Sequence, residues 1–520
     1  MVEQTTGSAS SILEMASFDG VLARGRPFGD SAYIHEQMHA AFKRRLAKIG
    51  GSVSAARRLL TRLEEAGAEQ QYRALGDPLV RRVIQEILAQ QRTGRPVVLP
   101  FDLCVEVLDT AARCLVNDVV SIPLHGATTD ACWLGQESRS AWIWSSEKLD
   151  DLTGYAFRKI IEHEFGGPLC DPTPGEIATL QTSAELLSEI LPQTSRSALE
   201  HTHLIGITPG VGGWERRSSS SQFRVTGAIF LNRKLLKNPW WVAEHLLHES
   251  LHQKLYDFRH GHSLLAQDLQ ETPEKHTEHH SVEGRKMVSL WNSPGVEELN
   301  RWDTHRALAA FHVYVHLSLF CTLAERRSAE LQDIYGTPDV PSPMTPSRKA
   351  FERAHYLAEN LHGLCWEELG LAGQWMTEWL TSILDAMNPF PPPPGASLHL
   401  LLDRYTREAR KVQKRSGAGM ADRLGDLLVS EVSTVQAVLA SIDAPTEIQE
   451  LVSSLKPGPE QSKGTAFPDA RFRIADTLLR LTPDGYSLNS LQAAAGDPPD
   501  EMVRKMVEAS SSELAQAGFS

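Results

Sequence analysis

Two copies of the pattern H-E-x-x-H occur in the chain, HEQMH at residues 35–39 and HESLH at residues 248–252. Residues four apart lie on one face of a helix, with Cβ atoms roughly 5–6 Å apart, so two imidazoles can bind one metal ion. In metalloenzymes the glutamate of the pattern acts as a general base or orients a ligand. The sequence around each copy must decide which of them holds a metal.

The HESLH copy lies in the segment NPWWVAEHLLHESLHQKLYDF, which has the features of a buried helix. Asn238 is a typical N-cap residue and Pro239 suits the first helical position. Large apolar residues surround the motif, and a buried polar ring is costly unless it has a partner. We therefore predict that His248 and His252 are metal ligands.

The HEQMH copy begins the segment HEQMHAAFKRRLAKIG, in which basic residues follow closely. This pattern is typical of an exposed or half-exposed helix, whose His and Glu side chains water can solvate. No strand-like stretch precedes it. We predict that this copy is structural and holds no metal.

The stretch QFRVTGAIFLN at residues 222–232 has alternating apolar residues and ends seven residues before Pro239. In zincin-type metalloenzymes an edge strand lies beside the metal-binding helix and binds an extended peptide through main-chain hydrogen bonds. The segment therefore predicts a zincin-like core, made of an edge strand plus the HExxH helix, and a peptide as substrate.

A third ligand is expected, because two histidines seldom hold a catalytic metal alone. The metzincin pattern would place Gly and His three and six residues after His252, where Leu255 and Phe258 stand, so that class is excluded. His260 and His262 are near in sequence but would face elsewhere if the helix continues.

The segment RWDTHRALAAFHVYVHLSLF is a better source of the third ligand. His305, His312 and His316 recur on or near one face of the predicted helix. We favour His312, with His316 as the alternative. The competing interpretation is that His312 and His316 are core histidines hydrogen-bonded to carbonyl groups.

The GAIFLN segment, the WVAEHLLHESLH segment and the later Arg–apolar–His helix together resemble the HExxH-motif peptide-modification proteins. These are encoded beside genes for ribosomally synthesised, post-translationally modified peptides, and the resemblance covers about residues 200–330. It implies an iron(II)- and 2-oxoglutarate-dependent oxygenase that β-hydroxylates a side chain of a precursor peptide. On this resemblance His248, His252 and His312 hold the iron, and Glu249 orients a ligand or water. Three histidines depart from the usual set of two histidines and one carboxylate, so the alternative is that a carboxylate takes the place of His312.

The carboxylate of 2-oxoglutarate would need a cation, and a guanidinium group can bind it at two points. Arg306 and Arg224 are the candidates. Spacing alone instead indicates a zinc peptidase, in which Glu249 is the general base that activates a zinc-bound water. A catalytically silent peptide-binding protein is the third hypothesis.

The chain has 520 residues, with 52 Lys and Arg against 65 Asp and Glu and a net charge of −13. This is the wrong sign for a protein that binds the phosphates of nucleic acid or an anionic membrane. We expect neither as a partner.

The six cysteines are scattered without a C-x-x-C pair, which argues against a cysteine zinc site and a secreted disulfide framework. The first residues lack the features of a signal peptide, and the most apolar run, at 308–325, contains two histidines and a glutamate. That run is expected to be a buried helix rather than a membrane span. A cytoplasmic location fits these features best.

The periodicity of apolar residues predicts a mostly α protein with a small mixed β-sheet, in which helical regions flank the zincin-like core. The polar segment at 271–284 is expected to be an exposed loop. Proline-rich segments at 336–347 and 389–395 are expected to interrupt the helices and supply boundaries. The predicted parts are a helical N-terminal region (1–118), a metal-binding catalytic core (119–335), a helical extension with Pro-rich linkers (336–395) and a helical C-terminal domain (396–520).

Overall fold

The computed structural model describes the backbone of residues 4–116, 133–134, 141–146, 152–215, 217–266, 287–288, 301–339 and 343–388. Three sequence predictions fall outside these residues: the polar connector at 271–284, the polyproline segment at 389–395 and the helical C-terminal domain at 396–520.

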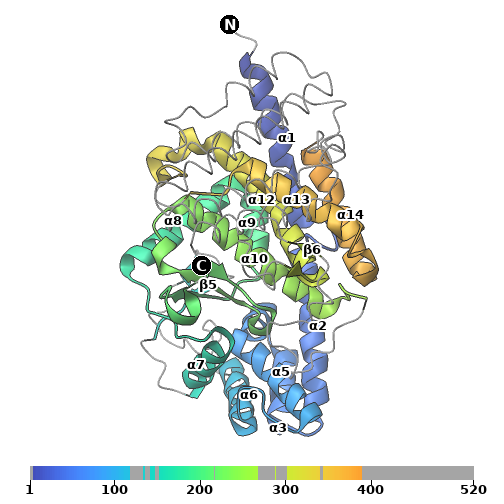
Figure 1. The fold of residues 1–520 in the computed structure, drawn as a ribbon. Coiled ribbons are helices and arrows are strands. Elements are labelled where there is room, and N and C mark those ends of the chain that lie inside the picture. The colour runs from blue at the N-terminus through green and yellow to red at the C-terminus, as the bar shows by residue number, and fades with distance from the viewer. Residues whose placement is uncertain are drawn as a thin grey trace, which may run out of the picture. The chain divides into compact units, whose positions relative to one another are not determined.

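The described residues are mostly helical with a small mixed sheet, as predicted (Figure 1). The helices are α1 (Gln4–Arg24), α2 (Ser31–Gly50), α3 (Ser54–Glu65), α4 (Ala68–Gly76), α5 (Pro78–Thr93), α6 (Phe101–Val116), α7 (Leu152–Phe165), α8 (Pro174–Ile190), α9 (Pro192–Leu199), α10 (Pro239–Gly261), α12 (Thr304–Tyr335), α13 (Ser347–His362) and α14 (Leu371–Met387).

The chain divides into two compact units. The first contains Met1–Glu274, Ala309–Ala350 and Leu369–Ile383, and the second contains Lys275–Leu308, Phe351–Glu368 and Leu384–Ser520. The four-part division inferred from the sequence stays a prediction.

The first unit contains a five-stranded sheet with strand order β1-β2-β3-β5-β4. Its strands β2, β3 and β5 are parallel, whereas β1 and β4 run antiparallel to their neighbours. All residues of β3 and β5 are buried, as expected for strands inside a sheet with both faces covered. The strands are β1 (Trp133–Leu134), β2 (Ala141–Ile143), β3 (Leu204–Thr208), β4 (Ser219–Ser220) and β5 (Ala228–Asn232), while β6 (Met287–Val288) and β7 (Arg301–Trp302) pair in the second unit.

The strand predicted at 222–232 is shorter than expected and is not an edge strand. A short 3-10 helix, η2 (Phe223–Val225), precedes β5, and Gly227 has a φ of 92°. A Cβ at Gly227 would lie 2.5 Å from the backbone oxygen of Gly76, so the chain turns tightly there and the strand begins only at Ala228. The edge position next to β5 belongs to β4.

The helix that carries HESLH begins where the sequence predicted. The Asn238 side chain accepts a hydrogen bond from the backbone N–H of Trp240 at 3.0 Å, and Pro239 is the first helical residue. Gln253 joins α10 to the start of β5, because it accepts from the Gly227 N–H at 2.6 Å and donates to the Ala228 carbonyl at 2.9 Å. The motif helix is thus held in a fixed register beside the sheet (Figure 1).

Among the described helices, α12 is the one that is long and apolar enough to cross a membrane by length and composition. Its apolar window is 100% buried, and core helices of globular proteins meet the same criteria. The helix ends at Tyr335, followed by Gly336 with a φ of 73°, and α13 begins at Ser347. The interruption predicted at 336–347 is therefore confirmed.

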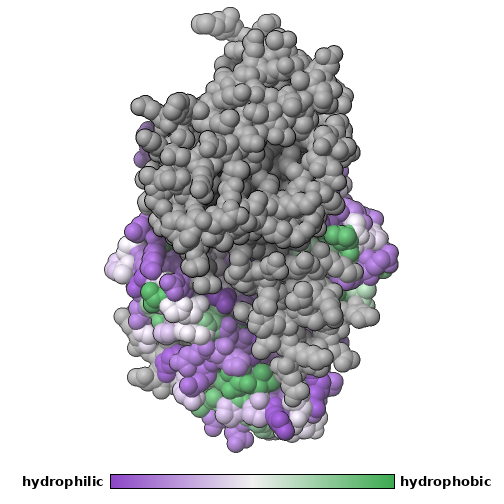
Figure 2. All heavy atoms as spheres, in the orientation of Figure 1, coloured by the Kyte–Doolittle hydropathy of each residue, from purple (hydrophilic) through white to green (hydrophobic). Residues whose placement is uncertain are grey.

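The described surface is ordinary in its hydropathy. Where Figure 2 colours the surface by hydropathy, hydrophilic side chains alternate with smaller hydrophobic patches. Large exposed hydrophobic residues such as Tyr155, Val211 and Ile334 lie far apart in the sequence. Scattered exposed apolar side chains are normal for a protein surface and identify no docking site.

Candidate metal centre

The two histidines of HESLH share one face of α10. His248 and His252 are both half-buried, their ring centroids lie 5.0 Å apart, and the ring planes meet at 71°. Tyr314 of α12 has its ring centroid 6.4 Å from that of His248. Two partly accessible imidazoles at this spacing are compatible with an open metal site, which must leave coordination positions for a reactant.

The glutamate of HESLH is directed into the protein. Glu249 is 4% exposed, and the Ser219 hydroxyl donates a hydrogen bond of 2.5 Å to its carboxylate. Ser219 belongs to β4, the edge strand. The carboxylate is therefore fixed between α10 and the sheet edge, an arrangement that suits an orienting group better than a general base that must meet water.

The α12 histidines lie in the core, each 1% exposed. His316 donates from Nδ1 to the backbone oxygen of His312 at 2.7 Å, which is the core-histidine arrangement that the sequence left open for this residue. Burial lowers the pKa of His316 to about 3. Burial, followed by the His316 and Lys254 charges, holds the pKa of His312 well below its ordinary value. Both rings are therefore neutral at pH 7, as a metal ligand must be.

The third ligand of the HESLH pair stays a prediction. His252 contributes to the lowered pKa of His312, so the two rings are electrostatically coupled. Within the described part of the chain, however, HESLH belongs to no group of three His, Cys, Asp or Glu ligand atoms that all lie within 4.8 Å of one another. His260 and His262 bind Arg45 and Tyr33 instead, through contacts of 3.0 and 2.8 Å.

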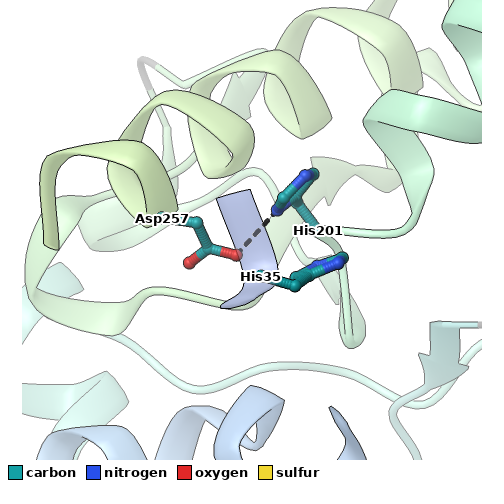
Figure 3. Close-up of side chains that lie close together, drawn as sticks. All are labelled: His35, His201 and Asp257. Atoms are coloured by element: carbon teal, nitrogen blue, oxygen red, sulfur yellow. Dashed lines mark hydrogen bonds and ion pairs between the residues drawn. The ribbon is translucent and has the colours of Figure 1, made fainter. Parts of the chain in front are cut away.

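The group that does meet this distance is His35, His201 and Asp257, called the His35 cluster below (Figure 3). Its side chains come from α2, from the turn between α9 and β3, and from α10. The rings of His35 and His201 stack with centroids 4.2 Å apart and an interplanar angle of 28°. His201 Nδ1 lies 2.8 Å from Asp257 Oδ2.

The His35 cluster is closed to solvent. Arg81 donates from Nη1 to Asp257 Oδ1 at 2.8 Å, and these two side chains are 1% and 0% exposed. The Ser31 hydroxyl lies 3.1 Å from His201 Nε2. Burial, with a smaller contribution from His201, holds the pKa of His35 well below its ordinary value, so its ring is neutral.

The prediction that HEQMH lies on an exposed helix face is wrong for His35, which is 5% exposed. His35, Met38 and Phe42 form a buried stripe of α2, and the basic residues after the motif lie on other faces. His39 has its ring centroid 6.0 Å from that of His35 and is not part of the cluster. Only the first histidine of this copy therefore belongs to the His35 cluster.

Sequence reasoning missed His201 and Asp257 entirely. Asp257 and Lys254 are charged residues in the apolar half of the motif helix, and both are buried. A charge that must be buried needs a partner, so their position was a usable signal. Spacing in the sequence does not predict their distant neighbours Arg81 and His201.

The two arginines expected to bind 2-oxoglutarate have other contacts. Arg224 lies in η2 rather than on a strand, with its Nη1 3.3 Å from Glu164 Oε2. Arg306 is exposed, belongs to the second unit and stacks over the Trp302 ring at 4.6 Å. Neither contact decides whether the residue binds 2-oxoglutarate, so the roles of both arginines stay predictions.

A scan against protein-family models finds no match for the chain, and a search of curated proteins finds none either. The resemblance to HExxH peptide-modification proteins therefore stays a hypothesis that depends on the motif and its surroundings. The function must be argued from the geometry.

Proposed function

We propose that the protein is a metal-dependent enzyme that modifies a peptide, with His248 and His252 as metal ligands. One observation carries the proposal. The half-buried imidazole pair lies on the helix whose Glu249 is bonded to Ser219 of the edge strand β4. An edge strand offers unpaired N–H and C=O groups, with which an extended peptide can pair. This zincin-like core, β4 plus α10, would hold a peptide beside the metal.

The finer proposal is that the metal is iron(II) and that the reaction is 2-oxoglutarate-dependent β-hydroxylation of a side chain in a precursor peptide. The motif resemblance supports it, and imidazole ligands suit iron. His312, buried and neutral, is the proposed third ligand. Bound iron would activate dioxygen, which with 2-oxoglutarate as the source of the other two electrons would oxidise a C–H bond of the peptide. Arg306 and Arg224 remain the proposed anchors of 2-oxoglutarate, and we derive no step through the co-substrate.

The chain's own residues have distinct tasks under this proposal. His248 and His252 present nitrogen ligands on the accessible side of α10, and Ser219 fixes the Glu249 carboxylate beside them. The apolar residues around the helix exclude water from the inner side of the site. Pairing with β4 would align a peptide side chain with the metal.

A zinc endopeptidase is the second candidate, because a half-buried H-E-x-x-H pair beside an antiparallel edge strand also suits peptide hydrolysis. In that reaction His248 and His252 would hold the zinc, and Glu249 would be the general base for the attacking water. Its burial at 4% exposure and its bond to Ser219 favour modification over hydrolysis.

The experiment co-expresses the full chain with each small open reading frame beside its gene and weighs the peptides. Purified protein is also freed of metal, reloaded with Fe²⁺ or Zn²⁺ and given the same peptides with and without 2-oxoglutarate. Gain of one oxygen with Fe²⁺ and 2-oxoglutarate supports hydroxylation, whereas fragments formed with Zn²⁺ alone support the peptidase.

The matched variants are His248→Ala and His245→Ala. His245 lies on the same helix and stacks on Trp241 at 3.7 Å, so its replacement perturbs α10 without removing a proposed ligand. Activity that persists in His248→Ala, or no product with either metal, would refute the proposal.

A further inference from the structure

Burial of the His35 ring carries a free-energy cost that the described residues do not offset. The residue is only 5% exposed, and both ring nitrogens are buried without a hydrogen-bond partner within the described residues. Buried polar atoms in folded proteins are nearly always bonded to protein, water or an ion. His35 therefore points to a ligand at this position.

The neighbours of His35 supply the remaining donors for a metal ion. One ligand atom each from His35, His201 and Asp257 lies within 4.8 Å of the other two. Around a tetrahedral zinc ion with bonds of about 2.0–2.2 Å, ligand atoms are roughly 3.3 Å apart, so only small side-chain shifts are needed. His201 Nδ1 and Asp257 Oδ2, now 2.8 Å apart, would separate slightly and exchange their hydrogen bond for bonds to the metal.

Arg81 would support the Asp257 carboxylate by a hydrogen bond without binding the metal itself. It donates to Asp257 Oδ1 at 2.8 Å, while Oδ2 faces His201. Carboxylates that bind metals are commonly hydrogen-bonded in this way. Because Arg81 offsets the charge of Asp257, affinity must come from the imidazole nitrogens. Such a donor set favours Zn²⁺ or a similar transition metal over Mg²⁺ and Ca²⁺, which prefer oxygen ligands.

We propose that His35, His201 and Asp257 form a second, closed zinc site that ties α2 and the turn before β3 to the motif helix α10. All three side chains are buried, at 5%, 0% and 0% exposure, so neither a peptide nor a free reactant reaches them. Because solvent and reactants do not reach these ligands, the site is structural rather than catalytic, with a buried water as the fourth ligand of a tetrahedral zinc ion. It would fasten the helix that presents His248 and His252, and it does not depend on the function proposed for that pair.

The test uses the full chain with His248→Ala and His252→Ala as background, so that the proposed open site cannot bind. The protein is stripped with a chelator and titrated with Zn²⁺ by calorimetry, with Mg²⁺ as the comparison ion. We expect one equivalent of Zn²⁺ to bind, a melting temperature that rises with Zn²⁺ concentration, and no binding of Mg²⁺.

Two further variants in this background assign the ligands. His35→Gln should abolish Zn²⁺ binding, whereas His39→Gln, four residues along the same helix, should leave it unchanged. Circular dichroism and urea unfolding without metal confirm that both variants fold.

Absence of Zn²⁺ binding in the background protein overturns the proposal, and that titration needs no change at His35. Equal loss of binding in His35→Gln and His39→Gln also overturns it, because HEQMH would then bind metal as an ordinary H-E-x-x-H pair. Loss of peptide modification is measured separately and bears only on the open site.

Discussion

The middle of α10 and its C-terminal end carry polar groups in opposite settings. Near its middle, His248 and His252 are half-buried and lie 5.0 Å apart, whereas Asp257 is wholly buried between Arg81 and His201. The first arrangement leaves room for a reactant, and the second leaves none. The comparison teaches that the H-E-x-x-H pattern specifies only which residues share a helix face. The packing around that face decides whether a metal there could be catalytic or structural.

The largest expected effect concerns Asp257, in the closed C-terminal end of α10. Asp257→Asn should lower the free energy of unfolding by about 3–5 kcal/mol, because it leaves the buried Arg81 charge without its partner. Urea denaturation measures the change. In the exposed pair of Arg58 and Asp109, Asp109→Asn should cost less than about 1 kcal/mol. Equal costs at the two sites would show that the closed end is not a tightly packed ion network.

The His248 and His252 pair should show the reverse pattern, with a large effect on activity and a small effect on stability. His252→Ala should reduce peptide modification by more than about 100-fold, because loss of a ligand exceeds the 10–100-fold typical of an outer-shell change. Its half-buried ring leaves little packing to lose, so the urea midpoint should move only slightly. A variant that unfolds readily but keeps its activity per folded molecule would reverse the comparison.

The link between the sheet edge and Glu249 can be tested with two serines. Ser219→Ala removes the hydroxyl that bonds Glu249 and should reduce peptide modification by roughly 10–100-fold without destabilising the fold. Ser221→Ala is the control, because the buried Ser221 hydroxyl has no hydrogen-bond partner among the described residues. Ser219→Thr should retain much of the activity. Identical rates in all three variants would remove the orienting role of the edge strand.

A buried histidine outside both sites provides the reference for acid sensitivity. Burial lowers the pKa of His355 to about 4. Below its ordinary pKa near 6.5 the unfolded chain takes up a proton that the folded chain does not, so stability falls as the pH drops. His355→Leu should remove about 1 kcal/mol of the loss between pH 6.5 and 5.5, measured by urea unfolding. Zinc should leave this difference unchanged, and a zinc-dependent difference would mean that metal acts beyond the two proposed sites.

Local features of the site could be predicted from the sequence, and distant ones could not. The N-cap of α10 at Asn238, the proline after it and the shared helix face of His248 and His252 follow from spacing within one helix. The half-burial of the pair does not, because the sequence predicted a buried helix. The His35 cluster joins residues that are far apart in the chain, with His201 and Asp257 separated by 56 positions. The periodicity of a single segment does not predict a contact between two such distant residues.

The sheet shows the same limit. Alternation placed a strand at 222–232, but the left-handed backbone of Gly227 and its close approach to Gly76 delay β5 to Ala228. The edge strand is β4, which has only two residues and is too short to show an alternating pattern. Close backbone approach is a property of the folded chain, which is why the periodicity misplaced both the strand and the edge.

The most direct test of the central claim is an anomalous difference map from crystals of the zinc-loaded protein, recorded at the zinc absorption edge. The account predicts a peak bound by the imidazoles of His248 and His252 on the accessible side of α10. A fully loaded crystal with no peak at these two rings would contradict it.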